Sequence, residues 1–177
     1  MGVYIRVKKP IKFIMTEEDY KKFSREEQKL VDNTESVFPL YTLDFEPIKH
    51  LSQFQWGYWE CETPKSISIS VSYSTWGEFR TMLANLVDEK YTHYMQWLNN
   101  ETFAQKPFNE IINFADNEGC FDYKICEELI KDFEQYYDKA KEKFSENVEH
   151  KWKWNIYTKI MQIIKDCIKY KGVVYYS

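Results

Sequence analysis

Three carboxylates gathered around one glycine form the part of this chain that most resembles a chemical site. The segment FADNEGCFD, residues 114–122, carries Asp116, Glu118 and Asp122 on either side of Gly119. A calcium loop of the EF-hand type needs oxygen ligands at positions 1, 3, 5, 7, 9 and 12 and a glycine at position 6. Placing Gly119 at position 6 puts the three carboxylates at positions 3, 5 and 9, but a phenylalanine and an isoleucine then occupy positions 1 and 12. The segment therefore lacks two ligands that usually complete the calcium shell.

Three interpretations of this segment follow. It is a helix-to-helix turn in which Gly119 takes a positive φ and Asp122 caps the next helix, a weak divalent-ion site, or a catalytic pair of Asp116 and Glu118. A catalytic pair needs one carboxylate desolvated enough to hold a proton near neutral pH. The chain has no nucleophile motif, phosphate-binding loop, dinucleotide fingerprint or zinc-type Cys and His spacing. We therefore favour the turn and expect no cofactor.

Aromatic residues offer a second candidate site. A pocket for a small ligand could be drawn from four of them: Trp56, Tyr58, Trp59 and Tyr73. Residues 66–74, SISISVSYS, alternate strictly and predict a strand with one apolar face. Its other face carries small hydroxyls, which leave room for a helix, a partner surface or water: Ser66, Ser68, Ser70 and Ser72.

Residues 141–159, KEKFSENVEHKWKWNIYTK, mix lysines with aromatic side chains, an alternation that could hold phosphates and stack bases. Acids are interleaved with these lysines, arginines are almost absent from the chain, and the net charge is −4. Binding to nucleic acids depends mainly on neutralising phosphates with Lys and Arg. The pattern therefore favours an amphipathic helix with solvated lysines, and nucleic-acid binding is not expected.

The surrounding elements follow from periodicity and caps. Strands are predicted at residues 2–7, 56–61, 66–74 and 173–176, with residues 62–66 joining the second and third as a hairpin. Thr16 and Ser24 cap one broken helix or two short ones, and a Thr75–Glu78 capping box opens a long helix reaching Leu98. One further helix follows Pro107, and another runs from Asp122 to Phe144. Residues 151–170 form the predicted central helix, with Gly172 at its C-cap. A short helix is possible at residues 47–54.

These elements predict an α+β fold. A single domain over residues 1–177 would pack a small antiparallel sheet, built from segments near Val3, Trp59, Ile69 and Val174, against four or five helices. The composition, 44% hydrophobic and 18% aromatic, is enough for a substantial core. No signal peptide or membrane span is recognisable, so a cytoplasmic protein with four free thiols is expected.

Several segments together resemble an uncharacterised family of small bacterial and phage-encoded proteins with a D-x-E-G motif. They are SVSYSTWGEFRTMLANL, FADNEGCF, Cys126, IKDC ending at Cys167, and the short aromatic terminus, which span about the C-terminal two-thirds of the chain. This chain departs from the family pattern at Asn117, where a cysteine is usual. The resemblance implies a bacterial or phage source and transfers no activity.

Three functions remain as predictions. The first is a non-catalytic intracellular protein that binds another macromolecule, with another protein as the expected partner; a phage or mobile-element protein that acts on a host macromolecule would be one instance. The second is a module that binds a small ligand or a divalent ion through the loop from Asp116 to Asp122 or through the aromatic pocket. The third is a small enzyme that uses Asp116 and Glu118.

Overall fold

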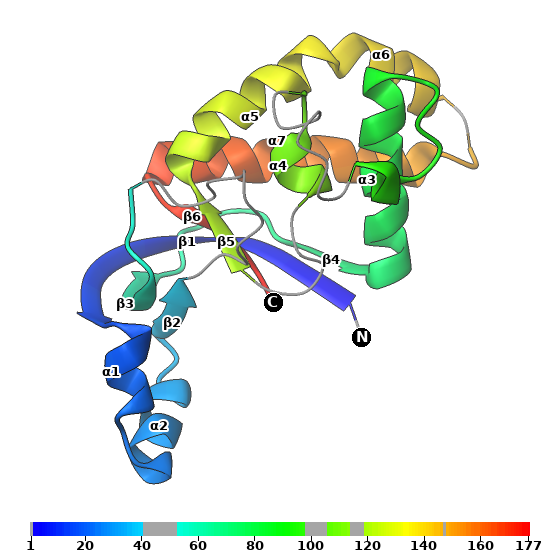
Figure 1. Ribbon diagram of the computed structural model, residues 1–177. Coiled ribbons are helices and arrows are strands. Elements are labelled where there is room, and N and C mark those ends of the chain that lie inside the picture. Colours follow the sequence, from blue (N-terminus) through cyan, green and yellow to red (C-terminus); the bar gives the residue numbers. More distant parts are fainter. Residues whose placement is uncertain (1, 41–52, 98–105, 114–118, 147) are drawn as a thin grey trace.

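The chain folds into an antiparallel sheet and a layer of helices, which confirms the α+β prediction (Figure 1). The computed structural model describes residues 2–40, 53–97, 106–113, 119–146 and 148–177. The strands and helices, in chain order, are β1 (Gly2–Met15), α1 (Glu17–Lys21), α2 (Arg25–Asp32), β2 (Val37–Leu40), β3 (Gly57–Glu62), β4 (Ile69–Ser72), α3 (Tyr73–Val87), the 3-10 turn η1 (Tyr94–Gln96), α4 (Asn109–Ile112), β5 (Gly119–Asp122), α5 (Tyr123–Gln135), α6 (Tyr137–Phe144), α7 (Lys151–Tyr170) and β6 (Val173–Tyr176).

β1 is the centre of the sheet, and every strand pair is antiparallel. The strands follow the order β2-β3-β1-β6-β5, and β4 also pairs with β1. The first half of β1 pairs with β4 and β6, whereas residues 9–15 pair with β3 and contain two irregularities in register. Bulges of this kind bend a strand, and β1 curls strongly at this end in Figure 1. The four predicted strand segments all belong to the sheet; β2 and β5 were not predicted.

The helices α3, α5 and α7 cover one face of the sheet. Alternate residues of β1, namely Val3, Ile5 and Val7, are fully buried on this face. The apolar stripe of α7 is buried as well, which confirms the predicted central helix, and it packs most extensively on α5. A smaller cluster lies on the other face and is formed by Leu40, Cys120, Val173 and Tyr175 with Phe38, Phe54 and Trp59 against it.

Most predicted caps are observed. Thr16 accepts a hydrogen bond from the Asp19 N–H, and Ser24 and Glu27 form a capping box. The residue in the left-handed conformation at the end of α7 is Lys171, with φ of 48°, rather than Gly172. Gly172 is instead required by a close approach, because a Cβ there would lie 2.4 Å from the Lys8 carbonyl oxygen.

The predicted strand over residues 66–74 is wrong in its length. It is a strand only from Ile69 to Ser72, and Tyr73 is already helical. The Ser72 hydroxyl accepts a hydrogen bond from the Thr75 N–H at 3.1 Å, so this serine caps α3 in place of the predicted Thr75–Glu78 box. The predicted hairpin is also wrong, since β3 and β4 pair with different halves of β1.

Two predicted helices are shorter than expected. α3 ends at Val87, because the Asn85 amide donates to the carbonyls of Glu89 and Tyr91 and draws the chain into a turn. Leu98 lies outside the described residues, as does most of the possible helix at 47–54. The helix that begins after Asp122 breaks at Tyr136 into α5 and α6. Within the described parts of the chain, none of the helices is both long and apolar enough to cross a membrane.

Candidate functional site

The described part of the acidic segment, residues 119–122, is the strand β5, which leads directly into α5; the predicted turn between two helices is wrong there. Asp116 and Glu118 lie outside the described residues. Gly119 begins β5 with φ of 122°, which confirms the predicted positive φ. Asp122 ends the strand, is fully buried and caps α5 as predicted. Its Oδ1 accepts the Lys124 and Ile125 N–H groups at 2.9 and 3.2 Å, so this oxygen serves the backbone.

The four aromatic residues proposed as one pocket do not come together. Trp56, Tyr58 and Trp59 lie at β3, which pairs with residues 9–15 of β1. Tyr73 follows β4, which pairs with residues 2–5 at the opposite end of the same strand. Tyr58 stacks on Tyr20 at 4.3 Å between ring centroids. The predicted pocket is therefore divided into two separate surfaces.

Tyr73 does line a groove, but with different neighbours. The groove has a volume of about 710 Å³, within the range usual for small-ligand sites. One wall is aromatic and comes from α3 and the turn after it; the other is basic and comes from the end of α6 and the start of α7. We call this the α3–α7 groove; the residues used below are Tyr73, Tyr91, His93 and Tyr94 on the aromatic wall and Lys143, His150 and Lys153 on the basic wall.

Neighbouring side chains of α3 and the turn after it hold the aromatic wall in place. The Arg80 guanidinium lies 3.8 Å from the centroid of the Tyr94 ring, and Arg80 is only 2% exposed. The His93 ring stacks on Tyr94 at 4.8 Å. The Thr81 hydroxyl accepts the Tyr94 N–H at 3.2 Å, and Gly77 leaves space for the ring, because a Cβ there would lie 3.2 Å from it. The Tyr94 ring is thus fixed before any ligand arrives.

The basic wall carries charge that the described residues do not fully neutralise through ion pairs. Lys143 donates to Asn85 Oδ1 at 2.8 Å and lies 3.7 Å from the Glu89 carboxylate. Lys153 lies 6.0 Å from the centroid of the Phe144 ring and forms no ion pair with any described residue. The groove therefore presents one ammonium group without a described ion-pair partner next to these rings, and the Glu78 carboxylate of α3 also lines it.

The start of α7 reverses the usual distribution of charge at a helix N-terminus. Helix dipoles favour acids in the first turn, and α1 and α2 obey this rule with Glu17, Glu18, Asp19, Glu26 and Glu27. α7 has no acid in its first turn and no side-chain cap, and it carries Lys151 and Lys153 there instead. Cations at this end are unfavourable, so an anion bound in the groove would be stabilised by the helix and the lysines together.

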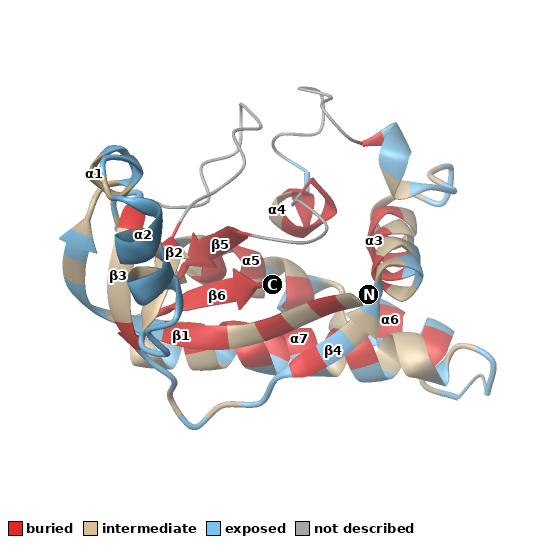
Figure 2. Cartoon of the chain, turned by 90° about the horizontal axis from the view of Figure 1, so that it is seen from below, coloured by how far each residue is buried: buried red, intermediate tan, exposed pale blue. Residues whose placement is uncertain are grey.

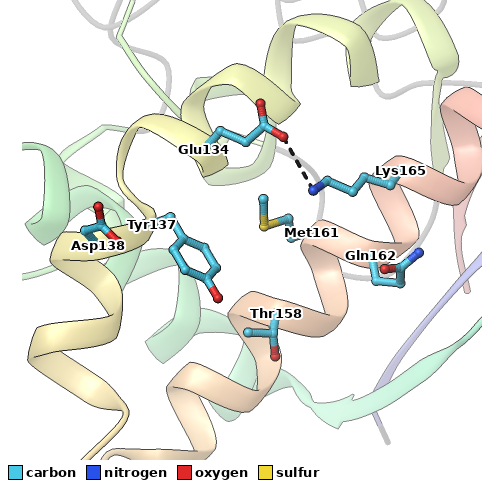
Figure 3. Close-up of a pocket in the computed structure, with 7 residues that line it drawn as sticks. All are labelled: Glu134, Tyr137, Asp138, Thr158, Met161, Gln162 and Lys165. Atoms are coloured by element: carbon cyan, nitrogen blue, oxygen red, sulfur yellow. Dashed lines mark ion pairs between the residues drawn. The ribbon is translucent and has the colours of Figure 1, made fainter.

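A second groove, between α7 and the junction of α5 and α6, is less suited to binding an anion. Its volume is about 480 Å³. Figure 3 shows the Lys165 ammonium directed at the Glu134 carboxylate, and the two are 3.4 Å apart. Because this ion pair already neutralises the one lysine, and Asp138 adds a further negative charge, the groove has no charge left for an anion.

Among the described carboxylates, two outside the acidic segment come closest to an acid–base pair. Burial raises the pKa of Glu110, on α4, to about 7. Burial also raises the pKa of Asp132, on α5, whose Oδ2 accepts the Phe108 N–H at 2.8 Å. This pair was not predicted from the sequence, although Glu110 stands within a short apolar helix. Among the described residues, no group of three or more metal-binding side chains accompanies them.

Sequence reasoning considered the lysine-rich segment 141–159 and assigned it to a solvated helix face. It did not find the aromatic wall opposite, because residues 73–94 reach the groove only through the packing of α3 on the sheet and helices. The available signal was the pair of lysines at the start of a long helix whose first turn lacks acids.

Comparisons with known proteins add no assignment. No protein-family model, curated protein or solved structure matches this chain, so the functional argument rests on its own residues.

Proposed function

We propose that this chain is a non-catalytic binding protein that takes a small anionic ligand with a planar ring in the α3–α7 groove. The observation that carries the proposal is the meeting of Lys143, His150 and Lys153, at an uncapped helix start, with a wall of fixed rings. The anionic group would lie against Lys153 and the start of α7. The planar ring would lie against Tyr73, Tyr91 or His93.

Both halves of the groove suit this ligand class physically. An ammonium-to-anion hydrogen bond is stronger than one between neutral groups and contributes most where water is partly excluded. Stacking of a base or similar ring on an aromatic side chain adds about 1–3 kcal/mol. The volume of about 710 Å³ leaves room for both parts of such a ligand at once. Nucleoside monophosphates are suitable probes because they combine one phosphate with one planar ring.

Isothermal titration calorimetry with AMP, adenosine and inorganic phosphate tests the proposal. AMP should bind more tightly than either of its parts. Lys153→Gln should weaken AMP binding by about tenfold, equivalent to about 1.4 kcal/mol, and leave adenosine binding unchanged. Lys159→Gln is the matched control, since Lys159 is an exposed lysine on the same helix outside the groove. Equal effects of the two variants, or AMP binding no tighter than phosphate binding, would contradict the proposal.

Binding to another protein is kept as a second proposal because of the shape of one end of the molecule. α1, α2, β2, β3 and residues 9–15 of β1 form an arm that projects from the helix layer (Figure 1). α1 and α2 contain no buried residue, and Figure 2 shows α2 largely exposed. The arm carries exposed apolar side chains at Ile11, Ile14, Leu30 and Trp56.

A photo-crosslinking residue at Leu30 tests this second proposal in a bacterial lysate. One defined adduct should form and should disappear when Ile14 is replaced by Asp. The same crosslinker at Lys159 should give no such adduct. An adduct that still forms in Ile14→Asp, or that forms equally from the crosslinker at Lys159, would exclude the arm as the binding surface.

A further inference from the structure

A cluster of cations and rings lies on the sheet face opposite the main helix layer. Val3, Ile5 and Val7 point into the helix-covered core, so the alternating residues Tyr4, Arg6 and Lys8 occupy the other face. Tyr175 is opposite Arg6 on β6. Phe38 comes from β2 and meets the Tyr175 ring edge-on at 5.7 Å. We call these five residues the cationic–aromatic cluster.

Both cations of the cluster contact rings. The Arg6 Cζ lies 5.1, 5.5 and 6.0 Å from the ring centroids of Tyr4, Phe38 and Tyr175. The Lys8 Nζ lies 3.7 Å from the centroid of Phe38 and donates to Thr63 Oγ1 at 2.7 Å. Lys8 is only 3% exposed, whereas Arg6, Tyr4 and Phe38 are partly exposed. The cluster therefore combines a buried ammonium group with a partly exposed guanidinium.

The positive charge of this cluster is not balanced by an ion pair within the described part of the chain. No described carboxylate forms an ion pair with Arg6 or Lys8. Glu62 pairs with Lys9, whose side chain alternates to the opposite face. Asp122 shares the face of Lys8, but its oxygens accept backbone N–H groups. The Arg6 Nε is buried without a hydrogen-bond partner.

Like charges held this close are unfavourable when no anion accompanies them. Burial, and then the neighbouring Arg6, lowers the pKa of Lys8 to about 8. An ammonium has three donors, and one is used by Thr63. Rings can offset part of the desolvation of a cation, but they accept no strong hydrogen bond from the remaining N–H groups. The cluster therefore keeps both donors and charge available for an anion.

We infer that the cationic–aromatic cluster is a binding site for an oxyanion, either a carboxylate or a phosphate, separate from the α3–α7 groove. The guanidinium of Arg6 offers the planar fork that such groups accept in pairs of hydrogen bonds. Lys8 adds a second charge from behind, and the rings exclude water from the contact. Ser70, which is paired with Tyr4 across β1 and β4, places a hydroxyl on the same face of the sheet.

Nitrogen-15 labelling of arginine gives a direct test, because the chain contains only Arg6, Arg25 and Arg80. Sodium phosphate and sodium acetate are titrated separately, and sodium chloride at matched ionic strength is the control. The Nε–H signal of Arg6 should shift and saturate with phosphate, acetate or both. Arg25 is exposed and should move only as it does in chloride, and Arg80 is 2% exposed and should not move. Tighter binding of phosphate or of acetate identifies the group that the site prefers.

Two variants show whether the response belongs to the cluster. Arg6→Lys keeps the charge, removes the assigned signal and the fork, and should weaken binding, measured from ligand spectra, by about tenfold. Arg25→Gln should leave binding unchanged. An Arg6 signal that never saturates, or that moves equally in chloride, would overturn the inference.

The dependence on pH provides a readout that a purely structural cluster would not give. Acetate stays ionised between pH 7 and 9. The charged or titratable groups that act on Lys8 are Arg6 and Cys61, and burial raises the pKa of the Cys61 thiol to about 12, which keeps it neutral. The phenyl ring of Phe38 and the hydroxyl of Thr63 do not titrate in this range, and the oxygens of Asp122, on the same face, accept backbone N–H groups. Acetate affinity should therefore fall as pH rises through about 8, where Lys8 loses its proton. Lys8→Met should abolish this dependence, and a wild-type affinity constant from pH 7 to 9 would contradict the role of Lys8.

Discussion

Replacing Asp122 tests whether this carboxylate stabilises the fold by accepting hydrogen bonds from backbone N–H groups. The carboxylate is fully buried at the point where β5 becomes α5. Its Oδ1 accepts two N–H groups of the first helical turn, and its Oδ2 accepts the Gln53 N–H at 2.7 Å. Asp122 therefore joins three backbone donors that no other described side chain satisfies.

The expected loss follows from these contacts. Removing an N-cap costs about 0.5–2 kcal/mol, and a buried N–H left without an acceptor costs a further ~1–3 kcal/mol. Asp122→Ala should thus lower the free energy of unfolding by roughly 2–4 kcal/mol. Asp122→Asn keeps one acceptor oxygen but turns an NH₂ group toward one of the donors, so its loss should be smaller, about 1–3 kcal/mol.

Urea unfolding followed by tryptophan fluorescence measures these losses directly. Glu142→Ala is the control, because Glu142 is an exposed carboxylate on α6 and its removal should change stability by less than about 0.5 kcal/mol. A loss below about 1 kcal/mol for Asp122→Ala, with an unchanged urea slope, would refute the argument that these donors depend on the carboxylate.

The remaining predictions concern backbone strain, the core, thiols and pH. Gly119→Val should cost at least about 1–3 kcal/mol because a β-branched residue is strained at φ of 122°, and Leu83→Ala about 2–5 kcal/mol because Leu83 is fully buried; urea unfolding measures both. Ellman's reagent should react slowly with the native protein and count four thiols in denaturant, since all four cysteines are free and buried. Burial raises the pKa of Glu110 to about 7, so the free energy of unfolding of the wild type should fall as pH rises from about 4.5 to 7. The Glu110→Gln variant should be more stable than the wild type by ~1–3 kcal/mol at pH 8 but not near pH 4.5. Rapid native labelling, or a Glu110→Gln variant without this pH-dependent advantage, would contradict the corresponding statement.

Features determined by neighbouring residues could be predicted from the sequence. The capping box at Ser24 and the apolar stripe of α7 depend on spacings of three or four residues, and both are observed. The free, buried cysteines also follow from composition and helix faces. In each case the physical cause lies within one or two helical turns.

Features determined by pairing across the chain could not be predicted. β2 and β5 are four residues each and become strands only because β3 and β6 offer them edges. The alternation in SISISVSYS was a true strand signal, but Ser72 serves better as a helix cap, and a serine can do either. A hairpin from Glu62 to Ser66 was the simplest local connection, yet the length of β1 lets both strands pair with it independently.

The candidate sites were visible in the sequence only as departures from ordinary charge placement. Lys151 and Lys153 stand where a helix prefers acids, and Arg6 and Lys8 alternate in a strand that also supplies the core. Each departure costs stability in isolation, which is typical of positions kept for binding. What the sequence could not show is the aromatic partner of each pair of cations, because those rings come from distant segments.

The acidic segment shows the opposite relation between pattern and role. It looked like a metal loop because carboxylates surround a glycine, yet the two described residues of the motif are explained by the turn from strand to helix. Gly119 supplies a backbone conformation that L-residues rarely adopt, and Asp122 supplies the acceptors that the start of α5 requires. If Asp122→Ala and Gly119→Val both destabilise the fold as calculated, a chain could need these two residues for folding alone. Their presence in a short motif would then be no evidence for a metal ion or for catalysis.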